Sequence, residues 1–165
     1  MAYLIEWVEQ VEGVEEWGQC KTPAGLLNVL LRGDVICASS WTLMPSQYSA
    51  SSPLRVLSEL EFGYQTSEFI SLKLLKQGTF FQHKVWAELL KIPWGNTRTY
   101  SEIAKQIDSA PRAVGNACRA NSYPWFIPCH RVVALSGLGG YSGQTLGPLV
   151  AIKETLLSYE LMTQI

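Results

Sequence analysis

The chain has 165 residues, of which 47% are hydrophobic and 16% are charged, a composition typical of a folded globular protein and not of a disordered one. This length suits one domain or two small lobes, and no apolar run reaches the roughly 18 residues that a membrane-spanning helix needs. The net charge of −1 hides an asymmetry, because residues 1–77 carry five Lys or Arg against nine Asp or Glu, whereas residues 78–165 carry eight against five. The basic C-terminal half permits a polyanionic partner without requiring one.

The first residues, MAYLIEWVEQVEGVEEW, are acidic and lack a basic leader followed by an apolar core, so they do not match a secretory signal. We therefore expect a cytoplasmic protein without a membrane anchor. In a reducing compartment the four cysteines, Cys20, Cys37, Cys118 and Cys129, are not expected to form a disulfide framework. No C-x-x-C pair occurs and the chain has two histidines, so the spacing of a zinc site is absent and no metal is expected.

The N-terminal half predicts a β-hairpin followed by two short amphipathic segments. Leu26–Leu31 and Val35–Thr42 read as strands, and the Arg32-Gly33-Asp34 sequence between them supplies the turn. The segments LRVLSELEF (54–62) and EFISLKLLK (68–76) are predicted to be helical. This half is therefore expected to form a small β-sheet lobe with helices.

The C-terminal half is predicted to be mainly helical. Its first segment, TFFQHKVWAELLKI (79–92), places Val85 and Trp86 on one face of a helix that Pro93 ends. Two shorter helices follow, and the tight turn between them gives a helix-turn-helix shape. Helix pairs of this kind are common, so the shape alone indicates DNA binding only weakly.

The two shorter helices carry recognisable start signals. In TYSEIAKQI, Thr99 and Glu102 form a capping box, and in PRAVGNACRA, Pro111 suits the first helical position. Arg112 then falls in the first turn, where the positive end of the helix dipole disfavours a cation by about 0.3–1 kcal/mol. Two interpretations of Arg112 remain open: an exposed arginine screened by water, or one presented to phosphates or a base stack.

The segment IPCHRVV (Ile127–Val133) interrupts an apolar run with a cysteine and a histidine. A free cysteine, with a pKa near 8.5, is mostly protonated at neutral pH, so a nucleophilic cysteine needs a base. His130 is the obvious base for Cys129, and Glu160, on the predicted terminal helix, is a candidate to orient the imidazole. Neighbours in an extended segment face opposite sides, so a bridging water or a turn is required. Cys118, in a helical pattern, is interpreted as a core residue.

The segments RAVGNACRANSYPWFIPCHRVV, GGYSG and AIKETLLSYE together closely resemble the O6-alkylguanine-DNA alkyltransferase family, whose PCHRV motif stands complete as Pro128 to Val132. Upstream, GTFFQHKVWAELLKIPWGNTRTYSEIA resembles the corresponding region of that family. The strong resemblance covers residues 78–160, and the N-terminal half matches only in TPAGLL…GDV. It implies an α/β (α+β) fold with an N-terminal lobe, residues 1–77, whose small sheet is of the ribonuclease-H type. The C-terminal lobe, residues 78–165, is expected to be mainly helical with a winged-helix-like DNA-binding unit.

The resemblance also implies an activity. Members of the family bind double-stranded DNA through the helix-turn-helix, rotate an alkylated guanine out of the stack and transfer its alkyl group irreversibly to a cysteine. The same reaction is expected here for O6-alkylguanine and O4-alkylthymine, with one turnover per molecule. No cofactor is implied because the DNA is the alkyl donor, and a monomer is expected.

The family's functional residues carry over to matching positions. Cys129 would accept the alkyl group, its proton passing through a water to His130 with Glu160 behind it. Tyr100 would donate a proton near the base, and Arg112 would fill the gap left by the flipped base. The remaining predicted DNA-binding residues are Thr99, Ser101, Ala113, Gly115 and Arg119, and the predicted substrate-pocket residues are Asn121, Pro128, Tyr141, Ser142 and Gly143.

Three features depart from the family pattern. Eleven residues separate Tyr100 from Arg112, about two fewer than usual, which tightens the turn between the helices. The segment after Gly143, QTLGPLVAIKE, is longer than the usual link to the last helix and puts the tolerance for bulky alkyl groups in doubt. Trp125 stands where the family often has an aliphatic residue and is a candidate for the pocket wall or the core.

Three other functions are possible alternatives to alkyl transfer. A non-repairing relative that binds alkylated guanine and recruits repair factors would have replaced the motif cysteine, which is present here. A thiol-based DNA-binding stress regulator needs a partner thiol that the sequence does not identify. A plain transcription regulator leaves the complete PCHRV and YSG motifs unexplained.

Overall fold

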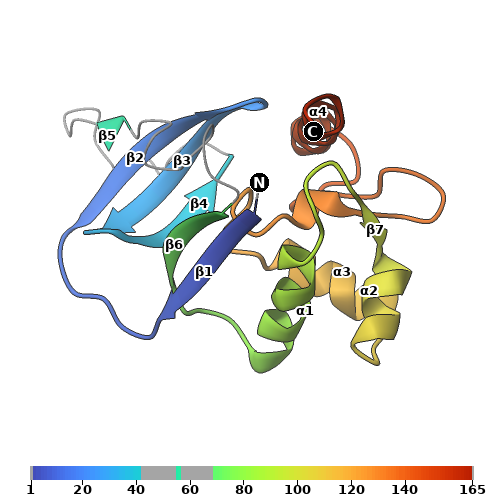
Figure 1. Cartoon of the computed structure of the whole chain (residues 1–165), viewed down its shortest axis with the longest axis horizontal. Helices are drawn as coiled ribbons and strands as arrows, with labels where there is room; N and C mark the ends of the chain where they lie inside the picture. Colours follow the sequence, from blue (N-terminus) through green and yellow to red (C-terminus); the bar gives the residue numbers. More distant parts are fainter. Residues whose placement is uncertain (1, 42–54, 57–68, 165) are drawn as a thin grey trace. The chain divides into compact units, whose positions relative to one another are not determined.

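The structure is a computed structural model, and it describes residues 2–41, 55–56 and 69–164. The chain divides into two compact units, Met1–Gln77 and Gly78–Ile165, which are coloured from blue to green and from green to red in Figure 1. None of the helices in these described ranges is long and apolar enough to cross a membrane.

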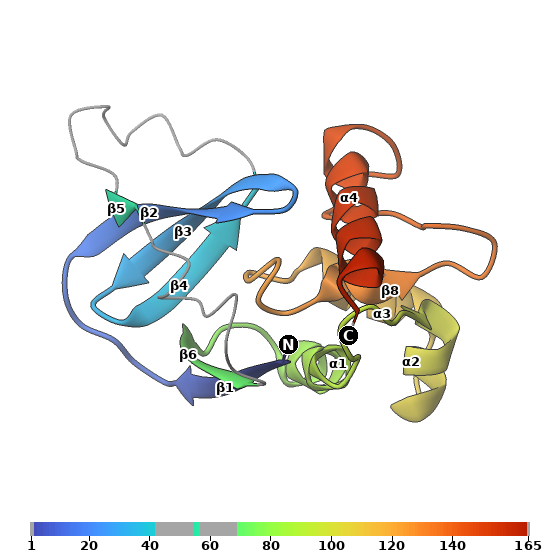
Figure 2. The ribbon, with the colours of Figure 1, turned by 45° about the horizontal axis from the view of Figure 1, so that its top comes forward.

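The N-terminal unit is built on a mixed sheet whose described strands have the order β1-β6-β4-β3-β2-β5 (Figures 1 and 2). The strands are β1 (Ala2–Val8), β2 (Glu15–Thr22), β3 (Gly25–Arg32), β4 (Val35–Ser40), β5 (Arg55–Val56) and β6 (Phe69–Leu75). Strands β2, β3 and β4 form an antiparallel meander, whereas β6 runs parallel to both β1 and β4.

The predicted hairpin is confirmed as β3 and β4. Gly33 begins its two-residue turn with a φ of 60°, a left-handed backbone that glycine adopts without steric cost. In β3 the side chains of Leu27, Val29 and Leu31 are all buried, so this strand contributes every second residue to the core of the unit.

The prediction of a helix over residues 68–76 is wrong, because Phe69–Leu75 forms strand β6. The buried side chains of this strand are Ile70, Leu72 and Leu74, which is the period of two that one face of a sheet requires. A short segment rich in leucine fits a helical stripe as well, and the parallel pairing with β1 and β4 decides between them.

The other predicted helix, residues 54–62, lies mostly outside the described residues. Its described part, Arg55–Val56, is strand β5 and pairs in parallel with Gly18 and Gln19 of β2.

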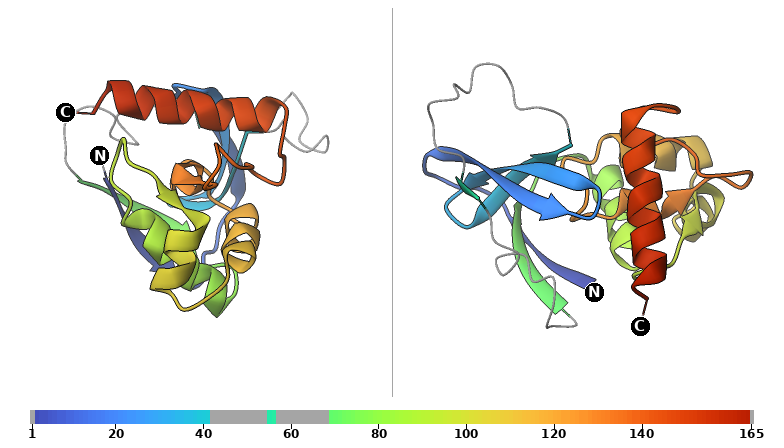
Figure 3. Two further views of the ribbon diagram at one scale, coloured as in Figure 1. Left: turned by 90° about the vertical axis from the view of Figure 1, so that its right-hand side faces the viewer. Right: turned by 90° about the horizontal axis from the view of Figure 1, so that it is seen from above.

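The C-terminal unit is mainly helical, and its segment 120–147 lies between α4 and the other helices (Figures 1 and 3). Its elements are α1 (Phe80–Leu90), β7 (Arg98–Thr99), α2 (Tyr100–Gln106), α3 (Pro111–Arg119), the 3-10 turn η1 (Cys129–Arg131), β8 (Val132–Val133) and α4 (Pro148–Met162). The short strands β7 and β8 pair in parallel, which joins the entry to α2 to the end of the cysteine motif.

The first helix forms as its sequence predicts. The Thr79 hydroxyl accepts a hydrogen bond from the backbone N–H of Gln82, and the Gln82 side-chain oxygen accepts one from the backbone N–H of Thr79, which completes a capping box. Val85 and Trp86 are buried, and Trp86 Nε1 donates to the carbonyl of Ala117 at 2.9 Å. This hydrogen bond connects α1 to α3, the second helix of the helix pair.

The helix pair is confirmed, including its start signals. Thr99 and Glu102 form a complete capping box at α2, and Pro111 occupies the first turn of α3. The side chains of Ile103 and Ala104 in α2 are buried, and so is that of Ile107 at its C-cap.

The turn between α2 and α3 is closed by a Schellman motif. The backbone N–H of Ser109 donates to the carbonyl of Ala104 at 2.8 Å, and that of Asp108 donates to Lys105 at 3.4 Å. This arrangement requires a left-handed residue after the helix, and Asp108 takes that place with a φ of 53°. The motif turns the chain at once, so α3 starts three residues later.

Asp108 therefore gives a test of the turn in which two substitutions act in opposite directions. Asp108→Gly should raise the free energy of unfolding by up to about 1 kcal/mol, because glycine adopts a positive φ without the steric cost of a side chain. Asp108→Val should lower it by about 1–2 kcal/mol, since a β-branched residue is poorly tolerated there. Urea denaturation measures both, and two changes of the same sign would contradict the described turn.

Candidate active site

The cysteine and histidine of the PCHRV motif lie in the single 3-10 turn η1, not in an extended segment. The turn removes the geometric difficulty of two neighbours that would face opposite sides of a strand. Cys129 has 4% of its surface exposed, and His130 is fully buried. A buried thiol and a buried imidazole are thus presented from one tight turn.

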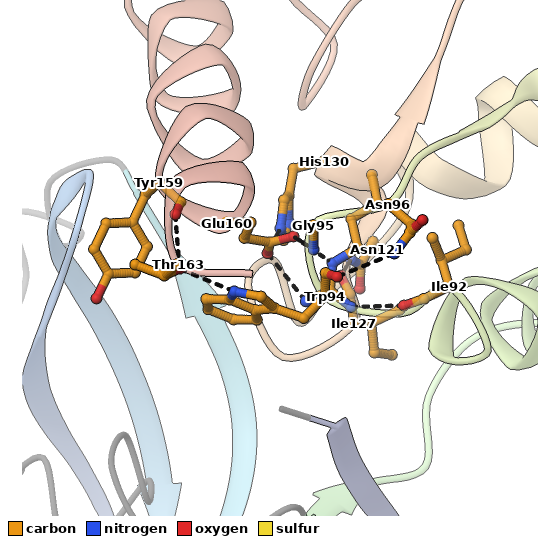
Figure 4. Close-up of polar contacts among 11 residues, drawn as sticks. Ile92, Trp94, Gly95, Asn96, Asn121, Ile127, His130, Tyr159, Glu160 and Thr163 are labelled. Atoms are coloured by element: carbon orange, nitrogen blue, oxygen red, sulfur yellow. Dashed lines mark hydrogen bonds and ion pairs between the residues drawn. The ribbon is translucent and has the colours of Figure 1, made fainter. Parts of the chain in front are cut away.

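A buried carboxylate fixes this turn. Glu160, on α4, points at His130 and accepts a hydrogen bond from His130 Nε2 to Oε1 at 2.7 Å (Figure 4). Arg131 binds the same carboxylate with two donors, Nε at 2.8 Å and Nη2 at 3.0 Å, and the Gly95 N–H donates at 3.3 Å. Burial alone would raise the pKa of Glu160, but the hydrogen bonds from His130 and Arg131 outweigh it and lower the pKa to about 2.

The ionised carboxylate determines the tautomer of His130. A carboxylate only accepts hydrogen bonds, so Nε2 must carry the proton and Nδ1 must carry the lone pair. Burial lowers the pKa of His130, although the hydrogen bond from Nε2 to Glu160 acts in the opposite direction. Nδ1 is buried, and no described group forms a hydrogen bond with it. The imidazole is therefore neutral and has one nitrogen free to accept a proton.

Asn121, which the sequence analysis predicted as a pocket residue, forms a hydrogen bond with the cysteine itself. Its Nδ2 donates to the carbonyl of Ile127 at 2.9 Å and to Cys129 Sγ at 3.2 Å. Its Oδ1 accepts from the Tyr123 N–H at 2.9 Å. One amide therefore bonds to the thiol and to the backbone on both sides of the segment that leads to it.

The Cys129 thiol is protonated in the resting protein. Burial raises the pKa of Cys129, while the hydrogen bond from Asn121 and the charge of Lys153 lower it. The net direction is upward, because the thiolate loses more hydration than these groups return. The arrangement accordingly calls for a base that takes the proton as the thiol reacts.

Lys153 is a residue that sequence reasoning missed. It is fully buried on α4, and its Nζ donates to the carbonyls of Val132 at 2.6 Å and Gly140 at 2.9 Å. Burial lowers the pKa of Lys153 to about 8, although the nearby Cys129 acts in the opposite direction. The available signal was its spacing, because Lys153 lies seven residues before Glu160 and so on the same helical face.

Arg131 was likewise left without a role, although it belongs to the motif itself. Besides Glu160, it donates from Nη1 to the carbonyl of Ile92 at 2.8 Å, and its guanidinium lies over the Trp94 ring at 5.4 Å. Trp94 Nε1 donates in turn to Thr163 Oγ1 at 3.1 Å (Figure 4). Arg131 thus connects the cysteine turn, the end of α1 and the end of α4.

A cavity of about 150 Å³ opens beside the thiol. It is lined by Tyr100, Gly115, Cys118, Arg119, Cys129, Gly140, Tyr141, Ser142, Gly143, Gln144 and Thr145. The structure therefore brings together the predicted nucleophile, the predicted tyrosine and the YSG loop.

Several predicted site residues lie elsewhere. Asn121 and Pro128, predicted as pocket residues, are not among those lining the cavity; Asn121 bonds to Cys129, and Pro128 directly precedes the turn η1. Trp125 does not line it either, because it stacks on His130. Arg112 is exposed in the first turn of α3, and the Thr99 hydroxyl is engaged in the capping box.

The remaining predicted DNA-binding positions follow the two helices. Ser101 lies in the first turn of α2, and Ala113 follows Arg112 in α3; both are partly exposed. Gly115 and Arg119 lie farther along α3, and both reach the cavity.

Tyr100 forms one wall of the cavity and is packed against glycine backbone. A Cβ on Gly139 would lie 3.2 Å from the Tyr100 ring, and one on Gly115 would lie 4.0 Å from it. The Tyr100 hydroxyl lies 3.5 Å from the Gly140 carbonyl. Burial raises the pKa of Tyr100, so its hydroxyl stays protonated and remains a hydrogen-bond donor.

The longer link after Gly143 begins at a defined turn formed by residues 141–144. The backbones of Tyr141 and Gln144 exchange hydrogen bonds at 2.8 and 2.9 Å, and the two residues between them, Ser142 and Gly143, have φ values of 47° and 84°. The Gln144 side chain accepts from the Leu149 N–H at 3.2 Å, which caps α4. The mouth of the cavity is thereby attached to the helix that carries Glu160.

Cys118 is the second thiol of the cavity, and the sequence indicated it only as a core residue. It lies near the end of α3 and is buried. Burial raises its pKa, with a smaller contribution from Cys129. A thiol-based regulator would thus have a second cysteine in the same cavity, but one held in its unreactive protonated form.

Comparisons with known proteins agree with the motif. Residues 80–162 match the family model described as 6-O-methylguanine DNA methyltransferase, DNA binding domain. A methylated-DNA–protein-cysteine methyltransferase of Archaeoglobus fulgidus is 34% identical over 127 residues, which cover 77% of this chain and 82% of the relative. A probable methylated-DNA–protein-cysteine methyltransferase of Acanthamoeba polyphaga mimivirus is 51% identical over 82 residues, covering 48% of this chain and 55% of the relative. The chain thus spans about half the length of some curated relatives it matches.

A solved structure extends the similarity to both units. The Mycobacterium tuberculosis protein OGT, crystallised in complex with DNA, matches with a TM-score of 0.68 and 34% identity, covering 88% of this chain and 92% of that chain. The mixed α/β fold predicted from the sequence is therefore confirmed.

Glu160 offers a test of the buried network. Glu160→Gln should lower the free energy of unfolding by about 3–5 kcal/mol at pH 7, because it leaves the buried Arg131 without a counter-charge. Glu154→Gln, an exposed substitution on the same helix, should change it by less than about 0.5 kcal/mol. Urea denaturation of the C-terminal unit measures both.

The loss of stability in Glu160→Gln, relative to the unchanged protein, is expected to depend on pH. A carboxyl whose folded pKa is lowered stabilises the fold above its ordinary pKa near 4.5, and this stabilisation is lost as the pH falls toward about 2. The difference between the unchanged protein and Glu160→Gln should therefore narrow between pH 5 and pH 2. A difference that stays constant would show that the Glu160 charge does not hold the network.

Proposed function

The chain belongs to the 6-O-methylguanine DNA methyltransferase family, and on that premise we propose that it repairs DNA by transferring the alkyl group of O6-alkylguanine to Cys129. The observation that carries the proposal is the buried Cys129 thiol that lines the cavity. The next residue, His130, has its Nε2 hydrogen-bonded to the Glu160 carboxylate. We extend the proposal to O4-alkylthymine, and to a monomer that acts in the cytoplasm.

DNA binding is assigned to the helix pair. Arg112 is exposed at the start of α3, and Arg119 lies at the end of the same helix beside the cavity. Cations at these two places suit phosphate contacts and the filling of a vacated base position in the minor groove. The damaged base would leave the stack and enter the cavity beside Arg119, a rotation that costs a few kcal/mol.

The first chemical event is removal of the cysteine proton. The Cys129 thiol is protonated at rest, and Nδ1 of the neutral His130 is the acceptor that the Glu160 contact leaves open. A water between the sulfur and Nδ1 would carry the proton, and the resulting imidazolium is stabilised by Glu160. Lys153 and the Asn121 amide stabilise the thiolate while it exists.

The second event is displacement at the alkyl carbon. The Cys129 sulfur forms a bond to that carbon, the bond from the carbon to O6 breaks, and its electron pair stays on the guanine. The guanine then takes up a proton, for which the Tyr100 phenol is the proposed donor. The product on the protein is a thioether, which none of the described groups of the site can hydrolyse, so each molecule acts once.

The central test follows the methyl group. The protein is incubated with a duplex oligonucleotide that carries one O6-methylguanine, and its peptides are then weighed by mass spectrometry. We expect one added methyl group on the peptide that contains Cys129 and none in Cys129→Ser. Binding without transfer would indicate a damage sensor, whereas oxidation of Cys129 to a disulfide with Cys118 would indicate a thiol regulator.

Arg112 can be tested separately from the chemistry. Arg112→Ala should slow transfer from duplex DNA by about 10- to 100-fold, because the flipped state loses a few kcal/mol of stabilisation. Transfer from the free base O6-methylguanine needs no flipping and should be unchanged. Single-turnover rates on the two substrates give the comparison, and an equal loss on both would remove Arg112 from the flipping step.

A further inference from the structure

We propose that Trp125 is a positioning residue for the transfer reaction, which holds the His130 imidazole in its working plane and shields it from water. The inference rests on the proposed function, because a fixed neutral base matters only if Cys129 must lose a proton. Trp125 does not line the cavity, so it acts through His130 and not on the substrate.

The two rings are stacked. Their centroids lie 5.9 Å apart with an angle of 17° between the planes, an offset parallel arrangement. A stacked neighbour covers the face of an imidazole and leaves its edge open. Both nitrogens of His130 therefore keep their in-plane directions, with Nε2 toward Glu160 at 2.7 Å and Nδ1 available as an acceptor. Rotation of the imidazole out of this plane would break the stack and the Glu160 bond together.

The backbone of Trp125 is held in an unfavourable conformation to place this ring. Its φ is 79°, a value that glycine and asparagine tolerate but that is a rare outlier for a bulky side chain. The segment is kept in this shape by the hydrogen bond from Ile127 N to the Tyr123 carbonyl at 2.9 Å and by a bridge between Pro124 and Ile127. A tryptophan at a position whose backbone favours glycine needs compensating contacts, and the stack on His130 is one of them.

A second tryptophan supports the stack. The Trp94 ring meets Trp125 edge-on, with centroids 6.1 Å apart and an angle of 79°. The same Trp94 ring lies under Arg131 at 5.4 Å and meets Tyr159 of α4 at 6.2 Å. Of the two side chains that bond to Glu160, His130 therefore contacts Trp125 and Arg131 contacts Trp94, and these two indoles contact each other.

The charges around His130 explain why shielding matters. Glu160 on α4 favours the protonated imidazole, whereas Lys153 on α4 and Arg131 on the same turn as Cys129 disfavour it. Burial is the largest influence and lowers the pKa of His130. Trp125, itself 2% exposed, supplies apolar surface against one face of the ring. Water in its place, against the face of the ring, would restore hydration to the imidazolium and raise the pKa of His130.

Three variants at this position separate stacking from backbone strain. Trp125→Phe keeps an aromatic face at the same backbone. Trp125→Leu keeps apolar bulk without the flat ring, and Trp125→Gly removes the ring and relieves the positive φ. Trp86→Phe, in the core between α1 and α3, is the matched control for the loss of a buried indole.

The first readout is NMR of DNA-free protein. The chain has two histidines, so the imidazole spectrum contains two sets of ring signals, and His83→Gln identifies the set from His130. We expect His130 in the unchanged protein to have a proton on Nε2, ring signals shifted by the indole, and a lowered pKa. Trp125→Leu and Trp125→Gly should lose the ring shift and titrate at higher pH, while Trp125→Phe and Trp86→Phe should not.

The second readout is the single-turnover rate of methyl transfer against pH. Because the base must be neutral, a raised pKa of His130 moves the acid limb of the profile to higher pH. The ratio of the rate at pH 8 to that at pH 6 should rise several-fold in Trp125→Leu and Trp125→Gly. It should stay within about twofold in Trp125→Phe and Trp86→Phe.

The outcomes separate the two proposals. If the NMR differences appear but the unchanged protein transfers no methyl group, the positioning role stands and the proposed function fails. If transfer occurs and neither the titration nor the pH profile differs between Trp125→Phe and Trp125→Leu, the positioning role is refuted. Should Trp125→Gly and Trp125→Leu not fold, an unchanged protein without an indole-induced shift of the His130 signals would refute it as well.

Discussion

The C-terminal unit depends on one buried charge. An ionised carboxylate taken out of water costs several kcal/mol unless it is paired and hydrogen-bonded. Glu160 meets this condition with two donors from Arg131, one from His130 and one from the Gly95 backbone. These partners come from the cysteine turn and from the loop after α1. Together with α4, which carries Glu160, a single carboxylate therefore joins three segments that are distant in sequence. The hydrogen bond from His130 that helps to stabilise the buried Glu160 charge also fixes the orientation of the His130 imidazole.

The proposed site combines a fixed base with a protonated nucleophile. Burial raises the pKa of the Cys129 thiol and lowers the pKa of His130, so the thiol keeps its proton and the imidazole stays neutral and able to accept one. On the proposed function, neither group therefore changes its charge before substrate arrives. The amide of Asn121 bonds to the sulfur within the turn η1, which fixes the position from which the thiol would react.

Local signals in the sequence predicted the elements that depend on local chemistry. The Thr99 capping box, the Pro111 helix start and the Gly33 turn each rest on contacts within a few residues, and all three are present. Strand β6 was mistaken for a helix because its pairing with β1 and β4 is formed by residues far away in the chain. The motif indicated the family and supplied Cys129 as the predicted nucleophile. It did not indicate the contacts of Lys153 and Trp125, because these depend on which side chains the fold brings against each residue.

Lys153 has a consequence for the energy of the whole reaction cycle. This buried cation rests on two carbonyl oxygens, those of Val132 and Gly140, and both of these partners are neutral. The negative charge that would balance it in the interior is the sulfur of Cys129, and that charge exists only between loss of the proton and capture of the alkyl group. In the proposed reaction, Lys153 therefore has no anion beside it before the Cys129 thiol loses its proton, and none after the thioether has formed. On that proposal, the fold is electrostatically complementary to the short-lived thiolate of its own cysteine and to neither of the two lasting states.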